Sequence, residues 1–142
     1  NTGILQSHLQ EFADDDGPVR LPSHQCDGCT GICPTQECRH AWYRAYLFVR
    51  LDRLADGWSR DRLVAELQGT GVPCMQGSCS EIYRESAFDG HASRPAKSLP
   101  IAKQLGEASI AFLVHPTIDE AAMTNIAKAT VDIISKATMA QS

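Results

Sequence analysis

The sequence predicts a small α+β domain, in which one mixed or antiparallel sheet is covered by helices. Residues 40–52 alternate between two sets of side chains in the manner of a strand. Residues 110–114 form a continuous apolar run, which suits a central buried strand. The segments around these runs repeat their apolar residues at helical spacing. The predicted order is therefore helix, strand, helix, short strand, helix, strand, helix.

The first helix is expected over residues 3–12, whose apolar positions have helical spacing, and the acidic turn at residues 14–18 ends it. A loop is expected from residue 19 to residue 39. The strand that follows is predicted to turn one set of side chains to a common face of the sheet, namely Ala41, Tyr43, Ala45, Leu47, Val49 and Leu51.

The second helix is predicted over residues 60–68, with Ser59 as its N-cap and two glycines at its end, Gly69 and Gly71. A short extended segment is expected at residues 72–75. It leads into a loop rich in glycine and serine, and residues 83–88 are expected to form a helical turn.

Ser98 is predicted to cap a third helix over residues 99–109, where Pro100 is tolerated in the first turn. After the apolar strand, the stretch from Thr117 to Glu120 has the pattern of a capping box. The last helix is expected to begin there and to run to about residue 137.

The composition fits one globular domain of 142 residues, with 43% hydrophobic and 21% charged residues. A net charge of −4 weighs against a nucleic-acid partner, which would call for a basic face. No apolar run is long enough to cross a membrane, and no signal-peptide pattern opens the chain, so we expect a cytoplasmic protein. The chain starts within a predicted helix and without an initiator Met, which we interpret as a fragment.

Four of the six cysteines lie in a Cys-rich loop at residues 22–39, namely Cys26, Cys29, Cys33 and Cys38. Thiolates gathered in a short loop can close a tetrahedral zinc site, and the absence of a secretion signal makes a disulfide framework the less favoured interpretation. The alternative is a surface insertion with free thiols. The spacing matches no standard iron–sulfur pattern.

The Gly- and Ser-rich loop is the main candidate site, and its candidate residues are Gly77, Ser78, Cys79, Ser80, Glu81 and Tyr83. Cys79 would be a nucleophile if His91 or His115 lay beside it as a base. An ordinary connection with a structural cysteine is the simpler alternative. We favour a third interpretation, in which the backbone amides and hydroxyls of residues 77–80 bind an anionic group.

Two arginines of the first long strand, Arg44 and Arg50, are further candidates, because a guanidinium can bind a carboxylate or a phosphate through two parallel hydrogen bonds. The alternative is an ordinary solvated strand face. No Gly-rich phosphate loop, paired-His motif or carboxylate dyad is present. The residues alone therefore do not specify a reaction.

Three stretches carry a family resemblance: HAWYRAYLFVR at 40–50, GVPCMQGSCSEIYRESAF at 71–88 and RPAKSLPIAKQLGEASIAFLVHPTIDE at 94–120. Together they resemble the carboxyl-terminal, small domain of the DegT/DnrJ family. These proteins are pyridoxal-phosphate (PLP) aminotransferases of fold type I that act on nucleotide-linked keto-sugars. The resemblance covers nearly the whole chain in the same order, and the Cys-rich loop looks like an insertion within it.

The resemblance implies a parent enzyme that moves an amino group from a donor, expected to be glutamate, to a nucleotide-linked keto-sugar. It also implies a homodimer, in which a larger amino-terminal catalytic domain holds PLP through a lysine. The lysines here do not match that motif, so this chain is expected to hold no catalytic or cofactor-binding residue and to be inactive alone. The segment from Gly77 to Tyr83 would face the active-site cleft and bind substrate.

Two other function classes stand beside this one. The first is a stand-alone metal-binding interaction module, which would dock a partner through the cluster from Cys26 to Cys38. The second is a thiol-dependent enzyme that uses Cys79. An exposed apolar face, where a lost domain had packed, would favour the aminotransferase fragment over a complete module.

Overall fold

The structure, a computed structural model, describes residues 1–22, 42–77 and 79–138. It confirms the α+β class with a four-stranded sheet in the order β1-β2-β4-β3. Each neighbouring pair of strands is antiparallel. The strands are β1 (Val19–Arg20), β2 (Arg44–Val49), β3 (Cys74–Gln76) and β4 (Ser109–Leu113).

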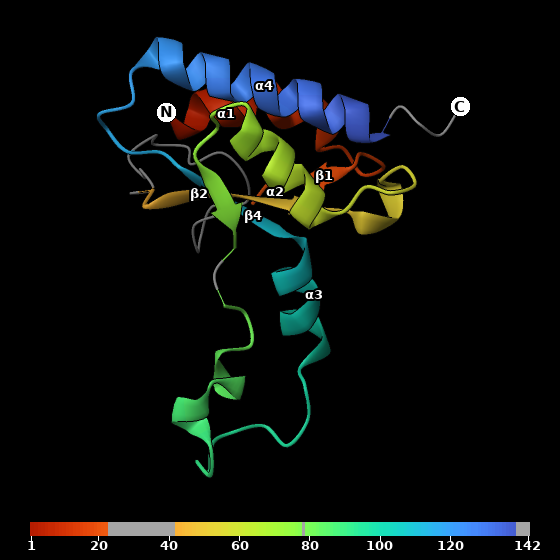
Figure 1. Ribbon diagram of the computed structural model, residues 1–142, viewed down its shortest axis with the longest axis vertical. Coiled ribbons are helices and arrows are strands. Elements are labelled where there is room, and N and C mark those ends of the chain that lie inside the picture. Colours follow the sequence, from red (N-terminus) through yellow and green to blue (C-terminus); the bar gives the residue numbers. More distant parts are fainter. Residues whose placement is uncertain (23–41, 78, 139–142) are drawn as a thin grey trace, which may run out of the picture.

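Three helices cover one face of the sheet, and a fourth helix lies on the other side (Figure 1). The covering helices are α1 (Thr2–Leu9), α2 (Arg60–Gly69) and α4 (Glu120–Thr138). Helix α3 (Pro100–Ala108) descends from the sheet together with the segment that precedes it. Four single 3-10 turns complete the described structure: Gln10–Phe12, Leu51–Arg53, Ile82–Arg84 and Ser86–Phe88.

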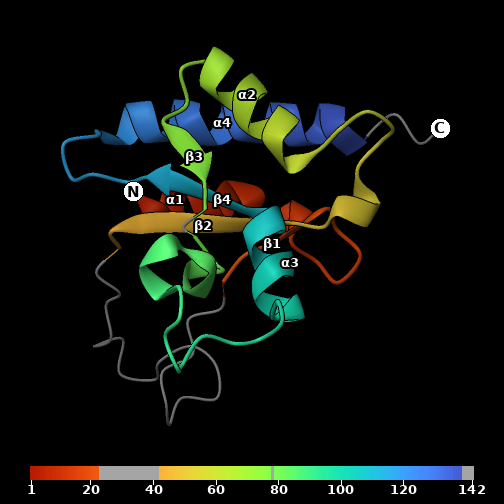
Figure 2. The same ribbon diagram turned by 60° about the horizontal axis from the view of Figure 1, so that its bottom comes forward.

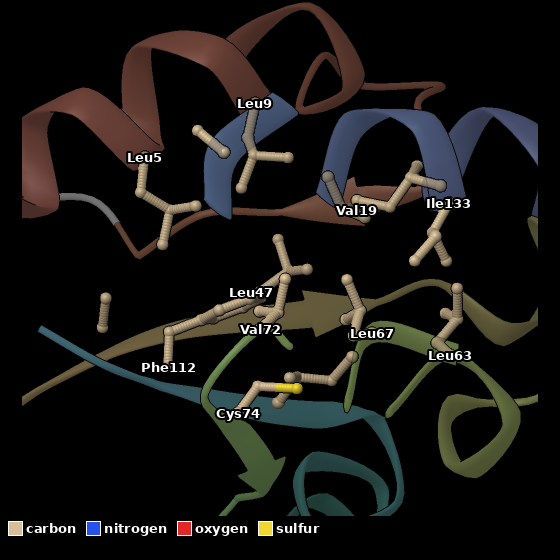
Figure 3. Close-up of a cluster of buried hydrophobic side chains, with 14 of the residues drawn as sticks. Leu5, Leu9, Val19, Leu47, Leu63, Leu67, Val72, Cys74, Phe112 and Ile133 are labelled. Carbon is tan, nitrogen blue, oxygen red and sulfur yellow. The ribbon is translucent and has the colours of Figure 1, made fainter. Parts of the chain in front are cut away.

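The core lies between the sheet and the three covering helices (Figure 3). The strand register places Leu47 opposite Ile110, and Ala45 opposite Phe112. Residues directly opposite each other in an antiparallel pair project to the same face, so these side chains all meet the helices. The helices contribute, among others, Leu5, Leu9, Leu63, Leu67, Met123 and Ile133. The burial of Ala45, Leu47 and Val49 confirms the alternation predicted for these positions of the strand.

The predicted strand was too long at both ends. Strand β2 begins at Arg44, so Tyr43 lies outside the sheet and is 84% exposed. Leu51 falls in a 3-10 turn and is also exposed. The two-residue strand β1 lies where a loop was predicted, and it is held by antiparallel pairing of Val19 with Val49. A strand of two residues is too short to show any periodicity.

Helix α2 begins and ends as predicted. The Ser59 side chain accepts a hydrogen bond from the Arg62 backbone N–H at 3.1 Å, which satisfies one of the free donors at the helix start. Gly69 is the last helical residue, and Gly71 has a φ of 84°, the left-handed conformation that favours glycine after a helix.

The other two predicted caps were wrong. Helix α3 has Leu99 as its N-cap, with no side-chain hydrogen bond, because the Ser98 hydroxyl donates instead to Glu81 Oε1. Asp119, and not Thr117, caps α4, since its Oδ1 accepts from the Ala122 N–H at 2.8 Å. The Thr117 hydroxyl is hydrogen-bonded to His115 Nδ1.

Candidate functional site

The Gly- and Ser-rich loop opens a long excursion of the chain, residues 77–99, here called the arm. The arm leaves the sheet after β3, makes two 3-10 turns and returns at α3 (Figure 2). A helical turn was predicted at residues 83–88, and the structure has two 3-10 turns there, Ile82–Arg84 and Ser86–Phe88. Five of the six candidate residues of the loop can be placed, because position 78 lies outside the described residues.

Glu81 joins the two ends of the arm. Its Oε1 accepts hydrogen bonds from the Tyr83 hydroxyl at 2.7 Å and from the Ser98 hydroxyl at 2.5 Å. The Tyr83 oxygen in turn accepts from the Leu99 backbone N–H at 2.7 Å. The hydrogen bonds from Ser98 and Tyr83, with the nearby Arg84 guanidinium, lower the pKa of Glu81 and favour its charged form. Glu81, Tyr83, Ser98 and Leu99 are called the Glu81 network below.

The small residues of the loop permit close packing against α3 and β4. The Gly77 N–H donates to the Ser109 carbonyl at 3.1 Å, and a Cβ on Gly77 would lie 2.5 Å from the Cβ of Ser109. A Cβ on Gly106 would likewise overlap the Ser80 side chain. The glycine and serine content of the loop thus has a structural cause, which exists whether or not an anion binds there.

Cys79 is exposed, and its thiol donates to Glu85 Oε1 at 3.4 Å. This hydrogen bond and the negative charge of Glu85 raise the pKa of the Cys79 thiol, which disfavours the nucleophilic thiolate. The predicted bases have other hydrogen bonds: His91 Nδ1 accepts from the Ser93 N–H, and His115 Nδ1 pairs with Thr117. Among the described residues, neither histidine is hydrogen-bonded to Cys79, whose thiol is bonded to the Glu85 carboxylate instead.

Replacing Glu85 with glutamine is expected to speed the alkylation of Cys79 by iodoacetamide at neutral pH. The neutral amide removes the charge that opposes thiolate formation, so the pKa of the Cys79 thiol should fall and the rate should rise by a few-fold. Peptide mass spectrometry measures the rate at this site, and Glu107→Gln is the control. A rate unchanged by Glu85→Gln would show that Glu85 does not control the thiol.

The two candidate arginines have different surroundings. Arg50 Nη1 donates to the carbonyl oxygens of Asp14 at 2.7 Å and Gly17 at 2.5 Å, so this side chain holds the turn after α1. Arg44 lies on the sheet face opposite the three covering helices, with its guanidinium 5.2 Å from the Tyr43 ring centroid. Within the described ranges, its buried Nε has no hydrogen-bond partner. Arg44 thus remains a candidate for an external acceptor, whereas Arg50 is structural.

Arg60 is a positioning residue that the sequence interpretation missed. Its Nη1 donates to the carbonyl oxygens of Gly106 at 2.9 Å and Ser109 at 2.8 Å, which lie at the carboxyl end of α3. The side chain is only 11% exposed. One signal was available, because Arg60 is the first residue of α2, where the helix dipole disfavours a cation.

No lysine of the chain is placed to hold PLP. Lys97, Lys103, Lys128 and Lys136 are all exposed, and Lys103 lies 3.7 Å from Glu107 in a surface ion pair. A lysine that binds PLP covalently needs a site enclosed enough to hold the cofactor beside it. None of the four lysines therefore lies in a site that could enclose the cofactor.

The predicted zinc ligands, Cys26, Cys29, Cys33 and Cys38, lie outside the described residues, as does the rest of the Cys-rich loop apart from residue 22. In residues 1–22, 42–77 and 79–138, no group of three or more His, Cys, Asp or Glu side chains is arranged to hold a metal ion. The same residues contain no helix long and apolar enough to span a membrane.

Comparison with known proteins identifies the fold. Neither protein-family models nor curated proteins give a match. Among solved structures, an aminotransferase from Psychrobacter cryohalolentis is similar over 95% of this chain, with 36% identity and a TM-score of 0.72. A DegT DnrJ EryC1 StrS aminotransferase from Brucella abortus is similar over 97% of the chain, with 20% identity and a TM-score of 0.63. The chain has the fold of a DegT/DnrJ-type aminotransferase domain.

The resemblance found in the sequence is thereby confirmed. A third DegT/DnrJ-type neighbour, DesV from S. venezuelae, is similar over 94% of the chain, with 15% identity and a TM-score of 0.65. The chain spans only about a third of these proteins: 32% of the Psychrobacter enzyme, 29% of the Brucella enzyme and 30% of DesV. The DegT/DnrJ-type domain described here is thus equivalent to one part of a larger aminotransferase.

Proposed function

We propose that this chain is the small, carboxyl-terminal domain of a PLP-dependent aminotransferase. The parent would transfer an amino group, with glutamate as the expected donor, to a nucleotide-linked keto-sugar. The observation that carries the proposal is the 36% identity to an aminotransferase over 95% of the chain. The proposal includes a homodimeric parent in the cytoplasm, as the family resemblance implies.

The two domains of the proposed enzyme would have different roles. When bound, PLP supplies the electron sink for amino transfer, while the protein supplies orientation and electrostatics. This chain has no enclosed lysine for the cofactor, so its larger partner domain would hold PLP. The present domain would close one side of the active site, and we propose no catalytic role for any of its residues.

The arm is the proposed substrate-facing element. It extends from the sheet on the side that α1, α2 and α4 leave uncovered, so its residues reach beyond the body of the domain (Figures 1 and 2). Glu81 and Tyr83 are already hydrogen-bonded within the Glu81 network, which holds this part of the arm in one conformation. Hydroxyls and backbone amides of residues 78–80 would contact the anionic groups of the substrate, whereas the Gly77 N–H is already bonded to the Ser109 carbonyl.

Amino transfer is tested with the complete reading frame that encodes this segment. The purified polypeptide is incubated with PLP, L-glutamate and a panel of nucleotide-linked keto-sugars, and mass spectrometry follows the aminated sugar. A mass change that matches exchange of a keto oxygen for an amine supports the proposal. No product from any keto-sugar, with PLP bound and glutamate consumed, would rule out this substrate class while leaving the aminotransferase in place.

The role of the loop is tested with Ser78→Ala and Ser80→Ala together in the complete enzyme. Loss of two hydrogen bonds to substrate should raise the KM for the keto-sugar by roughly 30-fold, since each hydrogen bond contributes about 1 kcal/mol. The Tm should stay unchanged, because alanine keeps the Cβ atom of Ser80 that lies beside Gly106 of α3. Unchanged KM and kcat would exclude these hydroxyls from substrate binding.

A further inference from the structure

Four apolar side chains on the arm and α3 face solvent. Ile101 is 71% exposed, Ile82 58%, Leu99 46% and Leu105 36%. These four residues are called the arm face below. Scattered apolar residues are ordinary on a protein surface, but a gathering of large ones on a projecting element indicates an interaction site.

Helix α3 exposes the two large side chains of its apolar side, Ile101 and Leu105, and only Ala108 on that side is buried, where the helix joins β4. Gly106 packs against Ser80 of the arm and, with Ala102 one turn earlier, forms a half-buried side of the helix. Lys103 and Glu107 form an exposed ion pair on a polar side. Ile101 and Leu105 are one helical turn apart and share a third side, which faces solvent. An amphipathic helix normally buries such a stripe, so the described domain lacks the partner that α3 requires.

The arm face is held in place before any partner binds. The hydrogen bond from the Leu99 N–H to Tyr83 keeps the turn that bears Ile82 next to the start of α3. At the other end of α3, Arg60 binds the carbonyl oxygens of Gly106 and Ser109. A surface that is already ordered avoids much of the entropy cost of association.

We propose that the arm face docks on an apolar surface of the remainder of the same polypeptide, the two thirds of an aminotransferase chain that this sequence does not include. The proposal rests on the proposed function, since the aminotransferases similar to this chain are about three times as long. The proposal adds to that function the surface through which this domain contacts the rest of the enzyme.

The size of the arm face favours this occupant over a second copy of the chain. Stable interfaces between separate proteins bury roughly 800 Å² on each partner, which is more than four partly exposed side chains provide. A domain on the same polypeptide has an effective concentration in about the millimolar range, so a smaller apolar contact suffices. The small size of the arm face therefore favours the rest of the same polypeptide as its partner.

The test compares two positions of α3 in the complete polypeptide, Ile101→Cys and the matched control Glu107→Cys. Both side chains are exposed in the domain, at 71% for the Ile101 residue and 56% for the Glu107 side chain. The tryptic peptides that contain them, residues 98–103 and 104–128, have no native cysteine, so peptide mass spectrometry gives each maleimide labelling rate separately. Each rate is divided by the rate in denaturant.

The expected result is that Ile101→Cys is labelled at least about tenfold more slowly than Glu107→Cys, because docking covers only the first position. A benzophenone photo-crosslinker at position 101 then identifies the surface that covers the arm face. The crosslink should join two positions of a single polypeptide. Equal labelling rates would overturn the proposal, as would a crosslink between two polypeptides. Protection at 101 in a polypeptide that binds no PLP would leave the docking surface standing and refute the proposed function.

Discussion

Replacing Phe112 with alanine is expected to lower the free energy of unfolding by about 3–5 kcal/mol, because a large cavity opens in the core. Phe112 is 1% exposed and occupies the central strand β4, opposite both Ala45 and Cys74. Small domains are stable by only about 5–15 kcal/mol, so the variant should be close to unfolding at room temperature. Urea denaturation followed by circular dichroism measures the change.

Tyr43→Ala is the matched control for Phe112→Ala. It removes an aromatic ring from a position just outside the sheet, where 84% of the residue is exposed, and should change stability by less than about 0.5 kcal/mol. Equal losses in the two variants would contradict the assignment of Phe112 to the core between the sheet and helices α1, α2 and α4.

Replacing Arg60 with alanine is the second large expected effect, a loss of about 2–3 kcal/mol in stability. Two charge-assisted hydrogen bonds disappear, and the carbonyl oxygens of Gly106 and Ser109 lose a partly buried donor. The loss should be concentrated where those carbonyls lie. Hydrogen–deuterium exchange at residues 100–108 should therefore accelerate far more than exchange in α4.

Arg53→Ala is the control for Arg60→Ala. Arg53 pairs with Asp16 at 3.0 Å, but both side chains are largely exposed, and such surface pairs contribute about 0–1 kcal/mol. Arg60→Lys adds a second comparison, because an ammonium keeps the charge without the planar guanidinium that bridges two carbonyls. If α3 exchanges at the wild-type rate in Arg60→Ala, Arg60 does not position this helix.

Periodic patterns explain which parts of the fold were predictable from the sequence. The strand around Leu47 and the apolar run at 110–114 were recognised, because burial on one or both faces of a sheet leaves a pattern in the residues themselves. The ends of β2 were missed, since the alternation continues by chance to Tyr43 and Leu51. Strand β1 has only two residues and forms through its pairing with β2.

Hydrogen bonds to other side chains explain the two helix caps that were predicted wrongly. Ser98 and Thr117 have the right chemistry for helix caps, but their hydroxyls bind Glu81 and His115 instead. Glu81 lies 17 residues before Ser98, so no local pattern shows that contact. Thr117 bonds to a neighbour two residues away, a local alternative that competes with the cap.

The composition of the candidate loop has a cause that the sequence did not reveal. Residues 79–83 lie on the arm, and their contact with substrate stays a prediction. The composition of the loop was attributed to anion binding, whereas Gly77 and Ser80 pack closely against Ser109 and Gly106. These contacts join residues far apart in the chain. Arg60 likewise contacts residues far along the chain, Gly106 and Ser109, so its role was not predicted from the sequence.

The central claim is that this chain is one domain of a PLP-dependent aminotransferase whose cofactor is bound elsewhere in the polypeptide. The most direct measurement is the visible absorption spectrum of the complete polypeptide, purified with PLP, before and after addition of L-glutamate. We expect a band of bound PLP that changes on glutamate addition, and no such band from the 142-residue chain alone. A complete polypeptide that binds no PLP, or a 142-residue chain that binds PLP by itself, would contradict the claim.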